Sequence, residues 1–124
     1  MAKMTDEARV KRDLKAFFNE IGAYWFMPAT HGYGRSGVPD FVICLHGHFF
    51  GIECKGTPKD KTTILQRIEL DKIFKAGGGV AVVDRSNIDV FKEWLQNVDI
   101  YRTKDFRRDA DKLIALAGIE DIEE

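Results

Sequence analysis

Residues 40–55 read Asp-Phe-Val-Ile-Cys-Leu-His-Gly-His-Phe-Phe-Gly-Ile-Glu-Cys-Lys, and this stretch decides the fold. Two almost wholly apolar runs, at 41–45 and 49–54, are separated by three residues around Gly47. Apolar runs of this length are typical of buried strands, and so short a connection permits only a tight hairpin. The sequence therefore predicts two antiparallel strands that are buried on both faces.

Charged residues stand at the open end of this hairpin. If the turn is centred on Gly47, residues that face each other sum to about 94, so Asp40 lies opposite Cys54 to within one residue. This register brings Asp40 next to Glu53 and Lys55, which share one face of their strand because side chains alternate. Two acids and a lysine are therefore expected to converge there.

Two interpretations of this convergence remain open at this point. Partly buried carboxylates repel each other and need a counter-charge, which a divalent cation with oxygen ligands would supply. Lys55 would then position or deprotonate a water, or stabilise charge developing on a phosphoryl group. The alternative is that Asp40, Glu53 and Lys55 form an ordinary exposed salt bridge at the ends of the strands.

The rest of the chain predicts helices around this hairpin. The order is helix, three strands, helix, strand and two helices, which indicates an α/β fold with a mixed sheet flanked by helices. All 124 residues are expected to form one domain, with its core at about 5–97 and a C-terminal helix and acidic tail at 104–124. The expected elements are a helix at 5–21 capped by Thr5, a strand at 23–27, an irregular loop at 28–39, a helix at 63–76, a strand at 80–83, a helix from a Ser86 cap to about 96 and a helix at 104–116.

Two helix residues are candidates to join the charged cluster. At about 100° per residue, Glu7 falls within about 40° of the centre of the apolar stripe of its helix, whereas Glu20 falls about 100° away. Glu7 is therefore the acid that could reach the sheet, or it merely stabilises the helix dipole. Gln66 lies in line with Leu70 and Ile73 and faces the sheet, where a phosphate, a water or a backbone carbonyl would satisfy its amide.

Three short motifs in combination resemble the PD-(D/E)XK nuclease superfamily and, within it, the VRR-NUC family. They are Gly37-Val-Pro-Asp40, Ile52-Glu-Cys-Lys-Gly56 and Leu65-Gln66, and the resemblance runs from about Asp6 to Ser86. It implies a restriction-endonuclease-like core and phosphodiester hydrolysis that depends on Mg²⁺, with Mn²⁺ able to substitute. The residue roles that it implies are metal ligation by Asp40, Glu53 and the backbone carbonyl of Cys54, orientation of the attacking water by Lys55, and completion of the site by Gln66 and by Glu7, directly or through water.

The resemblance also implies a substrate and an assembly. Stand-alone members of the family resemble Holliday-junction resolvases, so a structure-selective endonuclease acting on Holliday junctions, flaps or other branched DNA is expected, as a homodimer suited to two-fold symmetric junctions. The competing hypothesis is a non-catalytic module that binds branched or single-stranded DNA for a partner enzyme. Cys54 departs from the usual aliphatic residue, but it would coordinate through its backbone.

The glycine-rich loop is a candidate DNA contact. Gly32-Tyr-Gly-Arg-Ser-Gly37 matches a dinucleotide-binding pattern but precedes a strand instead of a helix, so no nucleotide cofactor is expected. A small phosphate-handling enzyme built on this loop is a third hypothesis. The residues expected at the DNA are His31, Tyr33, Arg35, Ser36, Lys59 and Lys61, although the two lysines would equally well be merely solvated.

Composition restricts the remaining possibilities. With 44% hydrophobic and 31% charged residues, the chain is typical of a globular domain and not of a disordered one. No apolar run predicts a membrane span or a signal peptide, so the cytoplasm of a bacterium or phage host is expected, or the nucleus of a eukaryote. Cys44 and Cys54 are expected to be buried free thiols, although a disulfide between facing strands stays open.

Overall fold

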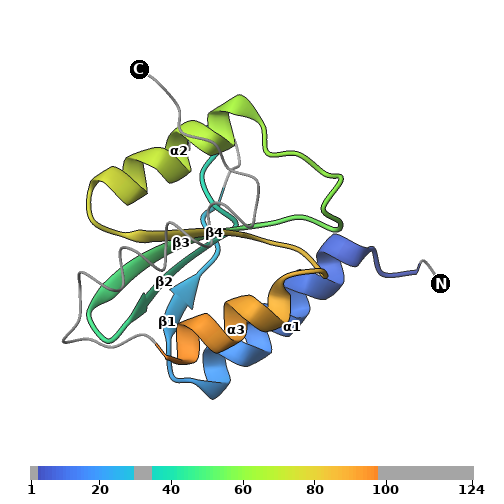
Figure 1. Cartoon of the computed structure of the whole chain (residues 1–124), viewed down its shortest axis with the longest axis horizontal. Helices are drawn as coiled ribbons and strands as arrows, with labels where there is room; N and C mark the ends of the chain where they lie inside the picture. Colours follow the sequence, from blue (N-terminus) through green and yellow to red (C-terminus); the bar gives the residue numbers. More distant parts are fainter. Residues whose placement is uncertain (1–2, 30–34, 98–124) are drawn as a thin grey trace.

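A four-stranded mixed sheet forms the centre of the computed structural model, which describes residues 3–29 and 35–97 (Figure 1). Neighbouring strands β1, β2 and β3 are antiparallel, and β4 pairs in parallel with β3 after a crossover through α2. The predicted α/β architecture is thus confirmed, while the helix predicted at 104–116 and the acidic tail lie outside the described residues. The elements are α1 (Asp6–Glu20), β1 (Tyr24–Phe26), β2 (Phe41–Leu45), β3 (His48–Cys54), α2 (Ile64–Lys75), β4 (Gly79–Val83) and α3 (Ile88–Gln96).

The hairpin of β2 and β3 has the predicted register to within one residue. Leu45 pairs with His48 across a turn whose residues His46 and Gly47 have φ values of 52° and 80°. Both values lie in the left-handed region that two-residue hairpin turns require. Asp40, which directly precedes β2, therefore reaches the end of β3 where Glu53 and Cys54 stand.

The helices form a layer on each side of the sheet. Helices α1 and α3 cover one face, and α2 packs on the other face against β3 and β4 (Figure 1). Phe18, Phe41 and Phe91 belong to the larger core, under α1 and α3, whereas Leu70 of α2 packs with Val80 and Val82 in a smaller one. None of the helices within residues 3–29 and 35–97 is long and apolar enough to cross a membrane.

The prediction that both hairpin strands are buried on both faces is wrong for part of the sheet. Burial alternates along β2, where Cys44 is exposed, and Phe49 at the start of β3 is 47% exposed. The physical reason is that α2 packs on β3 and β4, and among the described elements no helix covers the corresponding face of β1 and β2. Both cysteines are free, so the expectation of two buried thiols holds for Cys54 and fails for Cys44.

Of the two predicted helix caps, Thr5 is confirmed, and the structure adds a cap at Thr63 that was not predicted. Thr5 accepts a hydrogen bond from the Ala8 amide, and Thr63 forms a capping box with Gln66. The predicted Ser86 cap is wrong, because α3 begins at Ile88. The buried carboxylate of Asp84 instead accepts a hydrogen bond from the Ser86 amide at 2.7 Å and holds Ser86 in the preceding turn.

Gly37 joins the loop before Asp40 to the first turn of α2. Its φ is 84°, and a Cβ there would lie 2.5 Å from the carbonyl carbon of Leu65. Gly37→Ala should therefore lower the free energy of unfolding by about 2–5 kcal/mol, because left-handed strain adds to a backbone clash. Gly47→Ala is the control, since its φ is 80° but nothing lies within 4 Å of the added Cβ. Urea denaturation would contradict this account if both variants lost equal stability.

Candidate active site

The end of the β2–β3 hairpin brings the two predicted acids together. The Asp40 carboxylate accepts a hydrogen bond from the Cys54 amide, with Oδ2 and N 2.8 Å apart. Glu53 is only 3% exposed and lies on the face of β3 that α2 covers, because the side chains of Ile52 and Cys54 on either side of it belong to the core under α1 and α3. The hairpin register thus places a buried acid beside a half-buried one.

Gln66 joins Glu53 to Lys55. Its Nε2 donates to Oε1 of Glu53 at 3.3 Å, and its Oε1 accepts from Nζ of Lys55 at 3.1 Å. The same Oε1 also accepts from the Thr63 amide at 2.9 Å as part of the capping box. The start of α2 therefore fixes the amide, and the amide in turn orients an acid and a lysine.

The Glu53 carboxyl lacks a sufficient counter-charge. Burial and, after it, the neighbouring Asp40 carboxyl raise its pKa to about 9 against the smaller opposing effect of Lys55. The Oε2 atom of Glu53 is buried and has no hydrogen-bond partner among residues 3–29 and 35–97. Two ionised carboxylates are acceptors only, so Asp40 and Glu53 satisfy each other only when one of them carries a proton.

Helix α1 adds a second lysine that sequence reasoning missed. Nζ of Lys11 lies 3.5 Å from Oδ1 of Asp40 and 3.2 Å from Oε2 of Glu7. Partial burial lowers the pKa of Lys11, but Asp40 and Glu7 together raise it above its ordinary value. The i,i+4 spacing of Glu7 and Lys11 was available in the sequence, yet nothing in it indicated that Lys11 meets Asp40. Glu7 thus reaches the cluster through Lys11.

The residues at this end of the sheet fit a hard divalent cation. Asp40 and Glu53 supply carboxylate oxygens, and one oxygen of Glu53 has no partner in the described part of the chain. Within residues 3–29 and 35–97, no three His, Cys, Asp or Glu side chains form a metal cage. Magnesium does not need one, because it is usually held by one or two carboxylates together with waters and substrate phosphate. A cation here would relieve the repulsion between the two acids.

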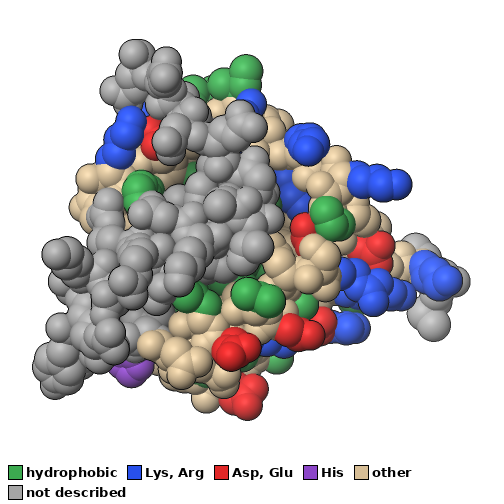
Figure 2. Space-filling model, in the orientation of Figure 1, with side chains coloured by type: hydrophobic (Ala, Val, Ile, Leu, Met, Phe, Trp, Pro, Cys, Tyr) green, Lys and Arg blue, Asp and Glu red, His purple; other side chains and the backbone are tan. Residues whose placement is uncertain are grey.

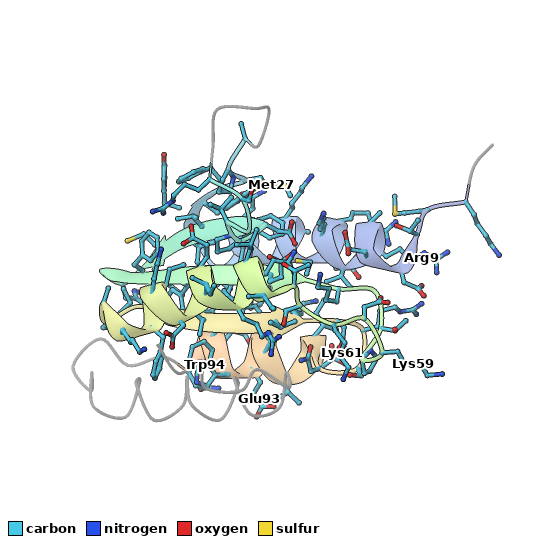
Figure 3. All side chains as sticks on the ribbon, turned by 90° about the horizontal axis from the view of Figure 1, so that it is seen from above. Arg9, Met27, Lys59, Lys61, Glu93 and Trp94 are labelled. Atoms are coloured by element: carbon cyan, nitrogen blue, oxygen red, sulfur yellow. The ribbon has the colours of Figure 1, made fainter. Side chains whose placement is uncertain are left out.

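The residues predicted to contact DNA are spread over two loops. Arg35 forms an ion pair with buried Glu69 at 3.2 Å, and its side chain is otherwise exposed, as is Ser36. Lys59 and Lys61 are exposed in the loop between β3 and α2, at the same end of the molecule as Arg9 (Figure 3). His31 and Tyr33 lie outside the described residues.

Comparison with known proteins gives one informative similarity. A solved structure described as a VRR_NUC domain matches the chain at 28% sequence identity with a TM-score of 0.63. The match covers 72% of this chain and 96% of that one, so nearly the whole of that domain has a counterpart here. No protein-family model and no curated protein sequence matches the chain.

Proposed function

Because the chain belongs to the VRR-NUC nuclease family, we propose that it is a metal-dependent DNA endonuclease that hydrolyses phosphodiester bonds. The observation that carries this proposal is the buried Glu53 carboxylate, which lies beside Asp40 with one oxygen unpartnered. A buried pair of acids destabilises a fold unless a cation joins it. A VRR-NUC domain with such a pair next to a fixed lysine favours catalysis over a purely structural role.

The proposed metal ligands are Asp40, Glu53 and the backbone carbonyl of Cys54. Mg²⁺, or Mn²⁺ in its place, would polarise the scissile phosphate and lower the pKa of an attacking water. Glu7 would contribute through water, since it already lies 3.2 Å from the lysine that contacts Asp40.

Lys55 is proposed to orient the attacking water and to stabilise negative charge as it develops on the phosphoryl oxygens. Its ammonium is held 3.1 Å from Gln66, so it does not have to find its position when substrate arrives. Gln66 acts as a positioning residue, because it holds both Lys55 and Glu53. Arg35, Ser36, Lys59 and Lys61 would contact the DNA backbone.

Branched DNA and a homodimer are the proposed substrate and assembly. The resemblance to stand-alone VRR-NUC proteins supports both, since a two-fold symmetric enzyme suits two nicks on a symmetric junction. The competing function is a module that holds DNA for another enzyme. A module of that kind has no use for a buried acid with one oxygen that no described residue satisfies, and the Glu53 environment therefore favours the enzyme.

Cleavage of a DNA panel tests the proposal. Junction, flap, splayed-arm, duplex and single-stranded substrates are incubated with the protein in Mg²⁺, in Mn²⁺ and in EDTA. We expect internal cleavage of branched substrates with either metal and none in EDTA. DNA binding without hydrolysis in both metals would favour the module, and preference for plain duplex would contradict structure selectivity.

A further inference from the structure

A basic cavity lies beside the candidate active site, between α1 and the segment that runs from β4 into α3. Its volume is about 560 Å³. We call it the arginine cavity, after the three arginines among its lining residues Arg9, Val10, Arg12, Asp13, Arg85 and Ile88.

The arginines of this cavity are only weakly engaged. Nη1 of Arg85 lies 2.9 Å from Oδ1 of Asp6, and Nη1 of Arg9 lies 3.8 Å from the same oxygen. Arg12 meets Asp13 at 3.5 Å. All these side chains are at least 36% exposed, and exposed ion pairs contribute little to stability. Among the described residues, three arginines face two aspartates here, which leaves one positive charge in excess, and a stronger anion would displace either carboxylate.

The arginine cavity lies at the same end of the sheet as Asp40 and Glu53. A Cβ on Gly56, the residue after Lys55, would lie 3.3 Å from the Cβ of Asp6, so the two segments are in contact. Arg85 follows β4 two residues beyond Val83, which pairs with Cys54. In Figure 2, lysine and arginine side chains gather at the right-hand end of the molecule, where Figure 1 places the start of α1 and the loop before α2.

We propose that the arginine cavity binds a backbone phosphate of the DNA substrate, away from the phosphate that is cleaved. This inference rests on the proposed function. Guanidinium groups bind phosphate oxygens in a bidentate manner, and such contacts position DNA without reading its sequence. DNA lying across this end of the sheet meets Lys59 and Lys61 on the side of α2 and the arginine cavity on the side of α1 and α3.

DNA binding in EDTA tests the inference without interference from cleavage. The double variant Arg9→Gln/Arg12→Gln is compared with the wild type by fluorescence anisotropy over a range of salt concentrations. We expect the Kd to rise about tenfold at low salt, and the slope of log K against log salt to become shallower by about one. Lys15→Gln/Lys75→Gln is the matched control, because it removes the same charge outside the cavity, and it should change the slope much less.

Two further measurements identify the ligand and exclude misfolding. Arg9→Lys/Arg12→Lys keeps the charge and should recover most of the salt slope, while all variants should melt near the wild-type temperature. Binding loss confined to DNA with a 5′-phosphate would assign the cavity to a terminal phosphate and overturn the inference. So would stabilisation by inorganic phosphate that the variant loses while its DNA affinity stays unchanged.

The outcomes separate this inference from the proposed function. If the wild type cuts DNA but Arg9→Gln/Arg12→Gln binds DNA as tightly as the control Lys15→Gln/Lys75→Gln does, this inference fails and the proposed nuclease function stands. If the wild type neither binds nor cuts DNA, both fail. At saturating DNA the arginine variant should cleave at close to the wild-type rate, because the arginine cavity does not touch the reacting phosphate.

Discussion

Replacing Asp40 by asparagine should lower Mg²⁺-dependent DNA cleavage by about a thousandfold or more, about 4 kcal/mol of barrier. The amide oxygen can still accept the hydrogen bond from the Cys54 amide, so the hairpin should keep its register. The lost charge removes half of the carboxylate pair that is proposed to hold the metal. The effect should be measured as single-turnover cleavage of the best substrate in Mg²⁺.

Asp71→Asn is a closely matched control for this variant. Asp71 is also a partly buried aspartate whose carboxylate pairs with one lysine, Lys75, at 2.9 Å. It lies on α2 away from the proposed site, so cleavage should stay within about twofold of wild type, as expected for a charge that the reaction does not use. If Asp40→Asn cleaves within tenfold of the control, Asp40 is not a metal ligand of the reaction.

The metal-free protein should become markedly less stable as the pH rises from about 5 to about 9. The pKa of Glu53 is about 9 in the folded state and close to 4.5 when the chain is unfolded. Between these values the folded protein holds a proton that the unfolded chain has released. Linkage then requires the free energy of unfolding to fall with increasing pH, by at most about 1.4 kcal/mol per pH unit for this one group. Lys11 titrates above this range because its pKa is raised from 10.5.

Glu53→Gln should remove this pH dependence, because the amide does not titrate and can still accept from Gln66. The difference in stability between wild type and Glu53→Gln, measured in EDTA by urea denaturation at several pH values, isolates the contribution of Glu53. Glu20→Gln serves as the control, since Glu20 is an exposed glutamate on α1. Equal pH slopes in wild type and Glu53→Gln would mean that Glu53 is ionised in the metal-free fold.

In the wild type, Mg²⁺ should counteract the loss of stability that rising pH causes in the metal-free protein. A cation between the two carboxylates stabilises their ionised forms, so its effect on the melting temperature should grow with pH. In Glu53→Gln the stabilisation by Mg²⁺ should be small at every pH. A Mg²⁺ effect that is independent of pH and of residue 53 would place the metal elsewhere.

Lys11 shows what sequence reasoning could not supply. The helical period identified Glu7 as the acid on the buried side of α1, and the structure places Glu7 near the cluster through its ion pair with Lys11. That Lys11 also lies 3.5 Å from Asp40 depends on how α1 lies against the end of the sheet. Helical periodicity fixes which residues share a face of one helix but not which residue of another element that face meets.

For Gln66 the sequence predicted the direction of the side chain but not its partners. Its position one helical turn before Leu70 predicted that it faces the sheet, and it does. The sequence left its partner open among a phosphate, a water and a backbone carbonyl. The partners are Glu53, Lys55 and the Thr63 amide, and the capping box at the start of α2 is what selects them.

By itself, the sequence determined the hairpin and the convergence of Asp40, Glu53 and Lys55 at its open end. Both depend on local geometry, because a tight turn fixes the register and alternation fixes the face. Only the tertiary structure decided that no described helix covers one face of β1 and β2, that Lys11 meets Asp40 and that three arginines form a cavity beside the site. Those features arise where elements distant in sequence pack together, and packing depends on the shapes of all their side chains at once.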